Sequence, residues 1–235
     1  MSILAIDTSN QALGVAIINE EKIIGEITTN IAKNHSLRLM PAIEQLMKEV
    51  NVELQNLEKI IVAKGPGSYT GVRIGLATAK TMAWALGIPV VGVSSLKVLA
   101  YQGRFFQGYI CPFFDARRGL VYSGLYEWKN GEIKQVWDEV NISITDLLSN
   151  LAKENKEILF LSPDIELHRE NITSSIESRA VIPEMAYHIS RASHVALAGL
   201  HENPQTTHAL TPNYLRLAEA EAKWLKQQKE KEENG

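Results

Sequence analysis

Glycines gather in one short block of the sequence, GPGSYTGVRIG, which runs from Gly65 to Gly75. The block follows an apolar run, KIIVAK, and leads into a stretch with helical spacing. Its backbone N–H groups and the helix dipole could therefore bind a phosphate. It lacks the Gly-Lys-Ser/Thr of a P-loop, and Thr70 stands where a dinucleotide fingerprint needs its third glycine. Phosphate binding is thus one of two interpretations.

Close helix packing is the other interpretation of this block. Small residues recur every four positions and form a stripe without side-chain bulk on one side of the helix: Gly71, Gly75, Ala79 and Ala83. Glycine inside a helix costs about 1 kcal/mol relative to alanine, and close approach of another element would offset that cost. The stripe could face this chain's own sheet or another protein, and spacing alone does not decide between them.

Two aspartates end apolar runs and could act on a phosphate or its metal ion. Asp7, with Thr8 and Ser9 after it, could hold a hydrated magnesium ion or cap a tight Asx turn. Asp115 has the same two interpretations. Arg117 beside it could clamp a phosphate or carboxylate, or could belong to a solvated turn.

Composition excludes several other site types. None of the six histidines has a histidine partner three to five residues away, so a helical zinc pair is absent. The single cysteine permits neither an internal disulfide nor a Cys-x-x-Cys site and fits a reducing compartment. A net charge of −3 argues against a strongly basic nucleic-acid binder. No stretch is long and apolar enough for a transmembrane helix. We therefore expect a soluble cytoplasmic protein.

The elements that must position these residues occur in two similar series. Buried strands are predicted over 2–7 and 109–115, each ending in aspartate, and each is followed by two further strands, a helix, a strand and a helix. The helices of the first half are expected at about 35–50 and 70–86, and the last helix of the second half at 186–202. Two such halves predict an α/β fold with two ribonuclease-H-like domains, as in the actin, Hsp70 and sugar-kinase group. Each domain would be a mixed sheet with flanking helices.

The domain boundaries follow from this repeat. We expect a partner-binding N-terminal domain over 1–103 and a C-terminal domain over 104–216. Residues 217–235 are expected to form a charged helix that frays into a solvated tail.

Several blocks together resemble the TsaB family, bacterial subunits in the synthesis of threonylcarbamoyladenosine in transfer RNA. They cover residues 1 to about 217: AIDTSN, NHSLRLMPAI, AKGPGSYTGVRIGLATAK, GIPVVGVSSL, FFDARRGLVYSG and TPNYLR. The glycine-rich block and DARRGLVYSG are the most specific of them. The family is similar to TsaD, its catalytic paralogue, which is glycoprotease-like.

The resemblance implies that this chain has lost the paralogue's chemistry. Ser95 and Leu99 stand where TsaD has its two metal-binding histidines. A hydroxyl ligates weakly and a leucine not at all, so the site would lack its Lewis acid. We therefore expect no catalytic residue and no metal site, and no cofactor bound by this chain, with ATP and magnesium used by the complex.

The resemblance also implies partners. TsaB would pair with and activate TsaD through helices of the N-terminal halves, joined by the ATPase TsaE, and would form a homodimer in isolation, with tRNA contacted only indirectly. The residues expected at that surface are His35, Leu39, Ile43, Met47, Gly71, Gly75, Ala79, Met82 and Ala83. The adenosine modified lies next to the anticodon. Two other hypotheses are an actin-like enzyme that binds and hydrolyses ATP, and a glycoprotease-type peptidase.

Overall fold

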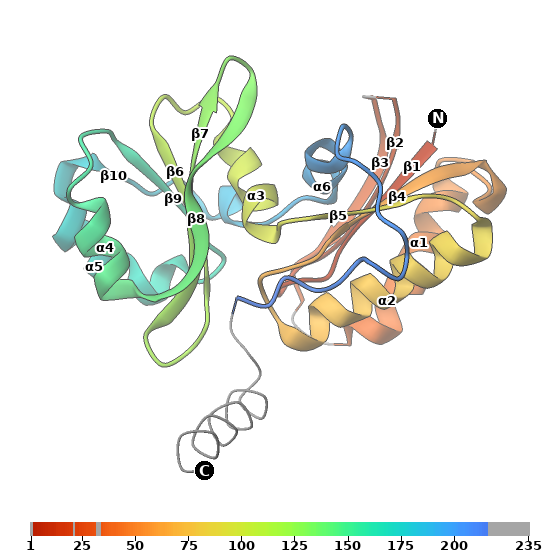
Figure 1. Ribbon diagram of the computed structural model, residues 1–235, viewed down its shortest axis with the longest axis horizontal. Coiled ribbons are helices and arrows are strands. Elements are labelled where there is room, and N and C mark those ends of the chain that lie inside the picture. The colour runs from red at the N-terminus through yellow and green to blue at the C-terminus, as the bar shows by residue number, and fades with distance from the viewer. Residues whose placement is uncertain (1, 21, 32–33, 216–235) are drawn as a thin grey trace, which may run out of the picture.

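The computed structural model describes residues 2–20, 22–31 and 34–215 of the chain. They form two five-stranded sheets with flanking helices (Figure 1). The charged helix predicted over 217–235 lies outside the described residues. None of the described helices has the length and apolar character needed to span a bilayer.

Each half of the chain contributes five strands and three helices to the described structure. The first half contains β1 (Ser2–Asp7), β2 (Leu13–Asn19), β3 (Lys22–Thr29), α1 (His35–Glu49), β4 (Leu57–Ala63), α2 (Tyr69–Leu86), β5 (Val90–Val93) and α3 (Ser95–Ala100). The second half contains β6 (Tyr109–Asp115), β7 (Leu120–Lys129), β8 (Glu132–Ser143), α4 (Ile144–Leu151), β9 (Ile158–Leu161), α5 (Ile165–Ile176), β10 (Ala180–Val181) and α6 (Ala192–Gly199). Single 3₁₀ turns lie at Leu54–Asn56, Tyr101–Gly103, Glu177–Arg179 and Met185–His188.

The two sheets have the same topology. The strand orders are β3-β2-β1-β4-β5 and β8-β7-β6-β9-β10. In each sheet the first three strands along the chain pair antiparallel and the last two pair parallel. This match confirms the predicted fold class, a duplicated mixed sheet with flanking helices.

Strand β1 is apolar throughout because both of its faces are covered. Leu4 and Ile6 belong to the core under α1 and α2, whereas Ile3 and Ala5 belong to the core under α6. Successive side chains of a strand point to opposite faces, so a central strand between two helical layers needs apolar residues at every position. This is why β1 has no polar residue between Ser2 and Asp7.

The third helix of each half packs on the sheet of the other half. Leu96 and Leu99 of α3 pack with Ile110 and Phe114 of β6 in the second half. The residues of α6, among them Val195, share a core with β1, β2 and β4 of the first half. Figure 1 shows α3 beside the second sheet and α6 beside the first. Each core therefore contains a helix from the other half, and the predicted boundary at 103/104 stays a prediction.

The last helix is shorter than the sequence predicts. Helix α6 covers Ala192–Gly199, not 186–202, and a 3₁₀ turn precedes it. The ring of buried His188 accepts a hydrogen bond from Ser162 N at 3.0 Å and donates one to Pro183 O at 3.0 Å. These bonds hold the chain at His188 in a turn, so the helix begins only after it. Helix α5 was not predicted at all.

After α6 the chain returns along the first half as a strap, residues 205–214. Gln205 N donates to the carbonyl of Val90 at 2.9 Å, which covers the β5 edge of the first sheet. Leu210 lies in the core under α1 and α2. Near the end of the strap, Asn213 N donates to Lys64 O at 2.7 Å.

A buried carboxylate fixes the start of α6. Glu26 on β3 accepts hydrogen bonds from Ser193 N at 3.1 Å and Ser193 Oγ at 3.0 Å, and pairs with Arg191 at 2.8 Å. Burial alone would raise the pKa of Glu26, but the bonds from Ser193 and the charge of Arg191 hold that pKa below its usual value. Glu26 thus acts as the N-terminal cap of a helix that comes from the other half.

We expect Glu26→Gln to destabilise the protein by about 1–2 kcal/mol near neutral pH, because charge-assisted hydrogen bonds are lost. A carboxylate whose pKa is lower in the folded than in the unfolded protein stabilises the fold at pH values above its unfolded-state pKa. This stabilisation is lost as the pH falls through the folded-state pKa. The difference in free energy of unfolding between variant and wild type, measured by urea denaturation, should therefore shrink as the pH is lowered to about 3. Exposed Glu44 on α1 supplies the control, Glu44→Gln, which should change little. A Glu26→Gln effect that is equal at both pH values would contradict this assignment.

Candidate functional site

The glycine-rich block lies directly against the turn between β1 and β2. A Cβ added at Gly71 would lie 2.1 Å from Thr8 O, and one added at Gly67 would lie 2.2 Å from Ser9 O. A Cβ added at Gly75 would lie 2.5 Å from Thr8 Oγ1. Real Cβ atoms do not approach backbone oxygens this closely. The glycines are therefore required for contact with this chain's own first turn.

Three backbone N–H groups of the glycine-rich block already have partners within the chain. Ser68 N donates to Ser9 O at 2.7 Å, and Gly71 N donates to Ser68 Oγ at 3.2 Å. Gly65 N donates to Ser95 Oγ at 3.2 Å. Of the two interpretations of the block, the structure favours packing over phosphate binding.

The predicted site at Asp7, Thr8 and Ser9 is buried and forms an Asx turn. Asp7 Oδ1 accepts hydrogen bonds from Ser9 N at 2.9 Å and Ser9 Oγ at 2.7 Å. Thr8 Oγ1 donates to Gly71 O at 2.7 Å. Burial raises the pKa of Asp7, although the bonds from Ser9 and the charge of His35 act in the opposite direction. The turn thus fixes the glycine block and leaves one carboxylate oxygen for other contacts.

The second predicted aspartate belongs to a small polar cluster at the end of β6. Asp115 N donates to Asp164 Oδ2 at 3.1 Å, and Arg117 N donates to Asp115 Oδ2 at 3.2 Å. His168 Nε2 lies 3.7 Å from Asp115 Oδ1. Burial and the nearby charge of Asp115 raise the pKa of Asp164. Sequence reasoning missed Asp164 and His168, and no signal marked them because α5 was not predicted.

Ser95 and Leu99, where the resemblance implies the paralogue's metal ligands, have structural roles in this chain. Ser95 is fully buried, and its N–H donates to Gly65 O at 3.0 Å while its hydroxyl accepts from Gly65 N. Leu99 is fully buried in the core between α3 and the second sheet. Within the described ranges, no group of three or more His, Cys, Asp or Glu side chains is arranged to hold a metal ion.

The small-residue stripe faces this chain's own sheet, which is one of the two alternatives that its spacing left open. The stripe and the apolar side of α1 are buried in this chain: Leu39, Ile43, Met47, Gly71, Gly75, Ala79 and Ala83. Only His35 and Met82 of the predicted partner-binding residues are half-buried. Within this chain, the close approach that the stripe permits is an approach to β1 and its turn.

The side of these helices that points to solvent consists of other residues. We call it the outer face; it comprises Leu37, Met40 and Glu44 of α1 and Arg73, Ala77, Thr81 and Trp84 of α2. Leu37 and Trp84 are each 73% exposed, which is high for large apolar side chains. A groove of about 560 Å³ runs between α2 and the strap, with Pro212 and Tyr214 on its wall. Figure 1 shows α1 and α2 side by side on one face of the first sheet.

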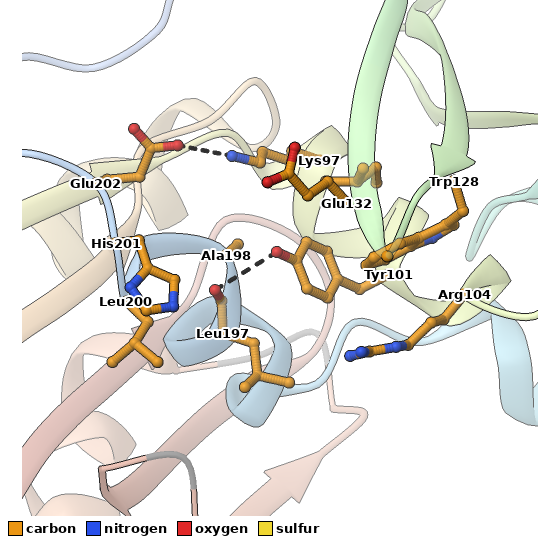
Figure 2. Close-up of a pocket in the computed structure, with 12 residues that line it drawn as sticks. Lys97, Tyr101, Arg104, Trp128, Glu132, Leu197, Ala198, Leu200, His201 and Glu202 are labelled. Atoms are coloured by element: carbon orange, nitrogen blue, oxygen red, sulfur yellow. Dashed lines mark hydrogen bonds and ion pairs between the residues drawn. The ribbon is translucent and has the colours of Figure 1, made fainter.

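A hollow of about 540 Å³ lies between α3, the C-terminal end of α6 and the β7–β8 hairpin (Figure 2). The Tyr101 hydroxyl donates to Leu197 O at 3.4 Å, and its ring meets Trp128 edge-on at 5.1 Å. Lys97 pairs with Glu202 at 2.7 Å. Burial raises the pKa of Tyr101, so its hydroxyl is a donor and not a base. The volume suits a small molecule, and sequence reasoning missed this hollow because its residues come from separate segments.

A second polar pocket, of about 500 Å³, lies beside the start of α3. Glu139 of β8 connects its walls, because its carboxylate accepts hydrogen bonds from Ser94 Oγ and Tyr126 OH and from Asn213 Nδ2. Burial and the charge of Glu139 raise the pKa of Tyr126, so this tyrosine also stays protonated. The carboxylate therefore joins α3, the second sheet and the strap.

Known proteins match nearly the whole chain. Residues 19–224 match the family model of TsaD, tRNA N6-adenosine threonylcarbamoyltransferase. The chain is 49% identical to the tRNA threonylcarbamoyladenosine biosynthesis protein TsaB of Bacillus subtilis (strain 168), covering 97% of this chain and 100% of that one. It is 30% identical to the protein of the same name from Buchnera aphidicola subsp. Schizaphis graminum (strain Sg), covering 77% and 88%. A solved structure, YeaZ from Pseudomonas aeruginosa, superposes with a TM-score of 0.76 at 23% identity, covering 91% and 100%.

We expect Gly71→Ala to lower the melting temperature although alanine favours a helix by about 1 kcal/mol over glycine. The new Cβ would meet the carbonyl oxygen of Thr8, and overpacking of this kind costs about 1–3 kcal/mol or more. Thr70→Ala, at the exposed neighbouring position, should leave the melting temperature nearly unchanged. A Gly71→Ala variant as stable as wild type would show that the turn can move away from the helix.

Proposed function

The chain belongs to the TsaB family of tRNA threonylcarbamoyladenosine biosynthesis proteins, and on that premise we propose that it is a non-catalytic partner subunit of TsaD. In this role it pairs with TsaD, activates it together with the ATPase TsaE, and supports modification of the adenosine next to the anticodon. It works in the cytoplasm and contacts tRNA only indirectly. ATP and magnesium are used by the complex.

The roles of Ser95 and Leu99 are the observation that carries this proposal. Both side chains are buried: the Ser95 hydroxyl accepts a hydrogen bond from the glycine loop, and Leu99 packs in the core between α3 and the second sheet. They stand at the positions where the resemblance places the paralogue's metal-binding histidines. A chain that keeps the scaffold around such a site, but fills its ligand positions with structural residues, is suited to hold a partner and not to transfer a threonylcarbamoyl group.

The outer face of α1 and α2 is the surface we propose for TsaD. Its large apolar side chains, Leu37, Met40 and Trp84, are 73%, 49% and 73% exposed. Small side chains, Ala77 and Thr81, lie between them on α2 and leave room for a partner's helix. Exposed tryptophan is a frequent centre of binding energy at interfaces. The same face serves the homodimer in isolation, so TsaD and a second copy compete for it.

A reconstitution tests the proposed function directly. With TsaD, TsaE, tRNA and threonylcarbamoyl-adenylate as the donor of the transferred group, omission of this chain should lower threonylcarbamoyladenosine formation at least about tenfold. This is equivalent to about 1.4 kcal/mol of transition-state stabilisation. This chain with TsaE and tRNA, but without TsaD, should form none. Product formation in that second mixture would overturn the non-catalytic assignment.

A pair of substitutions on α2 tests the surface. We expect Ala77→Arg to keep the wild-type melting temperature and to abolish the heterodimer peak in size-exclusion chromatography, because Ala77 is exposed on the outer face. Ala79→Arg should instead melt much earlier, because Ala79 is fully buried and a charge there is unpaired. Thr145→Arg, at an exposed position of α4, is the matched control, and this variant should fold and pair with TsaD normally. A stable Ala77→Arg protein that still pairs with TsaD would remove the outer face from the interface.

A further inference from the structure

The groove between α2 and the strap has an apolar floor. Leu76 of α2 and Leu210 of the strap are 3% and 1% exposed and form this floor, and Pro212 and the ring of Tyr214 form one wall. Exposed Ala77 of α2 also lines the groove, which therefore opens onto the outer face. An apolar groove beside an exposed helix is the kind of surface on which an amphipathic segment docks.

Neither wall of the groove carries an acidic residue. Helix α2 and the strap contain no Asp or Glu, but α2 contributes two cations. Arg73 Cζ lies 4.4 Å from the centre of the Tyr69 ring, and Lys80 Nζ donates to Leu210 O at 2.9 Å. No carboxylate among the described residues forms an ion pair with either cation. The groove therefore complements an apolar segment that carries a negative charge.

The described part of the chain ends beside this groove. Leu215 is the last described residue, and the ring of Tyr214 before it stacks on Tyr69, the first residue of α2, at 5.4 Å. The strap runs opposite to α2, from Val90 to Tyr69, so the chain must reverse to enter the groove. Residues 216–235 follow. Ten extended residues span about 33–36 Å, more than the length of about 27 Å expected for the 18 residues of α2, so the segment can reach the whole groove.

The sequence of this segment matches the groove in pattern and in charge. It begins RLAEAEAKWLKQ. Leu217, Trp224 and Leu225 share one side at helical spacing, and Glu221 falls between them on that side. A carboxylate inside an apolar stripe is costly against an uncharged surface, but a neighbouring cation gives it a charge-assisted partner. Because the segment is joined to its own groove, docking is intramolecular and has a high effective concentration.

We propose that residues 217–228 fold back into the groove of their own chain. Trp224 covers the apolar floor, and Glu221 neutralises Arg73. The docked segment covers Ala77 and with it part of the outer face, so TsaD must displace the segment in order to bind. This last step rests on the proposed function, whereas docking itself requires no partner.

Protease protection tests docking in the absence of any partner. Trypsin cleaves after Lys226 only when the segment has left the groove, so the cleavage rate reports the undocked fraction. Cleavage at this site, followed by mass spectrometry, should be at least about tenfold slower in the full chain than in a free peptide of residues 216–235. Equal rates in chain and peptide would overturn the proposal. Protection that grows with protein concentration would also overturn it, because the groove that is occupied would then belong to a second copy.

Two charge reversals outside the segment leave its cleavage sites unchanged. Arg73→Glu places a like charge beside Glu221, so most of the protection should be lost. Lys48→Glu, at an exposed position of α1, makes the same change in net charge and should keep the full protection. Equal protection in the two variants would contradict the assignment.

Affinity for TsaD tests whether the docked segment competes with the partner. Trp224→Ala in the full chain should bind TsaD more tightly than wild type, by the factor of protection that the substitution removes, because only the undocked fraction can bind. Glu232→Ala, past the apolar stripe, should keep the wild-type affinity. Unchanged affinity in Trp224→Ala would overturn the competition. If neither form binds TsaD while protection persists, the proposed function fails and docking of the segment stands.

Discussion

The close contact between the start of α2 and the first turn constrains everything around it. Thr8 O and Ser9 O occupy the space that side chains at Gly71 and Gly67 would need. Because the helix lies so near β1, its next turns bury Ala79 and Ala83 in the core. This leaves a fixed set of α2 side chains for the solvent. The position of the proposed partner surface is thus decided on the opposite side of the helix, by atoms that never meet a partner.

The same contact gives Ser95 a structural role. The glycine loop is held from one side by Ser9 and from the other by Ser95, which exchanges two hydrogen bonds with Gly65. A histidine at this position would have to give up that role to reach a metal ion. In the proposed non-catalytic role, Ser95 serves instead to stiffen the loop. Stiffness at the base of α2 benefits a protein whose proposed work is to present that helix.

Sequence patterns predicted the fold well because local rules governed those parts. Apolar runs and turn residues marked the strands, and the repeat of the two halves followed from their order. Local rules could not predict what the small-residue stripe packs against. Spacing shows that residues share one side of a helix, but it does not show what covers that side. The cluster at Asp115 was also hidden, because Asp164 is 49 residues away and only sheet pairing brings the two together. The shortened α6 depends on His188, whose partners are likewise set by tertiary contacts.

The exchange of α3 and α6 between the halves has a consequence for synthesis of the chain. The first sheet is complete once β5 has left the ribosome, yet the face that receives Val195 and Ala196 stays bare until almost the whole chain has been made. At ordinary rates of translation this interval is on the order of 10 s, during which an apolar sheet face is open to misassociation. Closure of the core that is begun first thus waits for α6, which is the last of the described helices to be made.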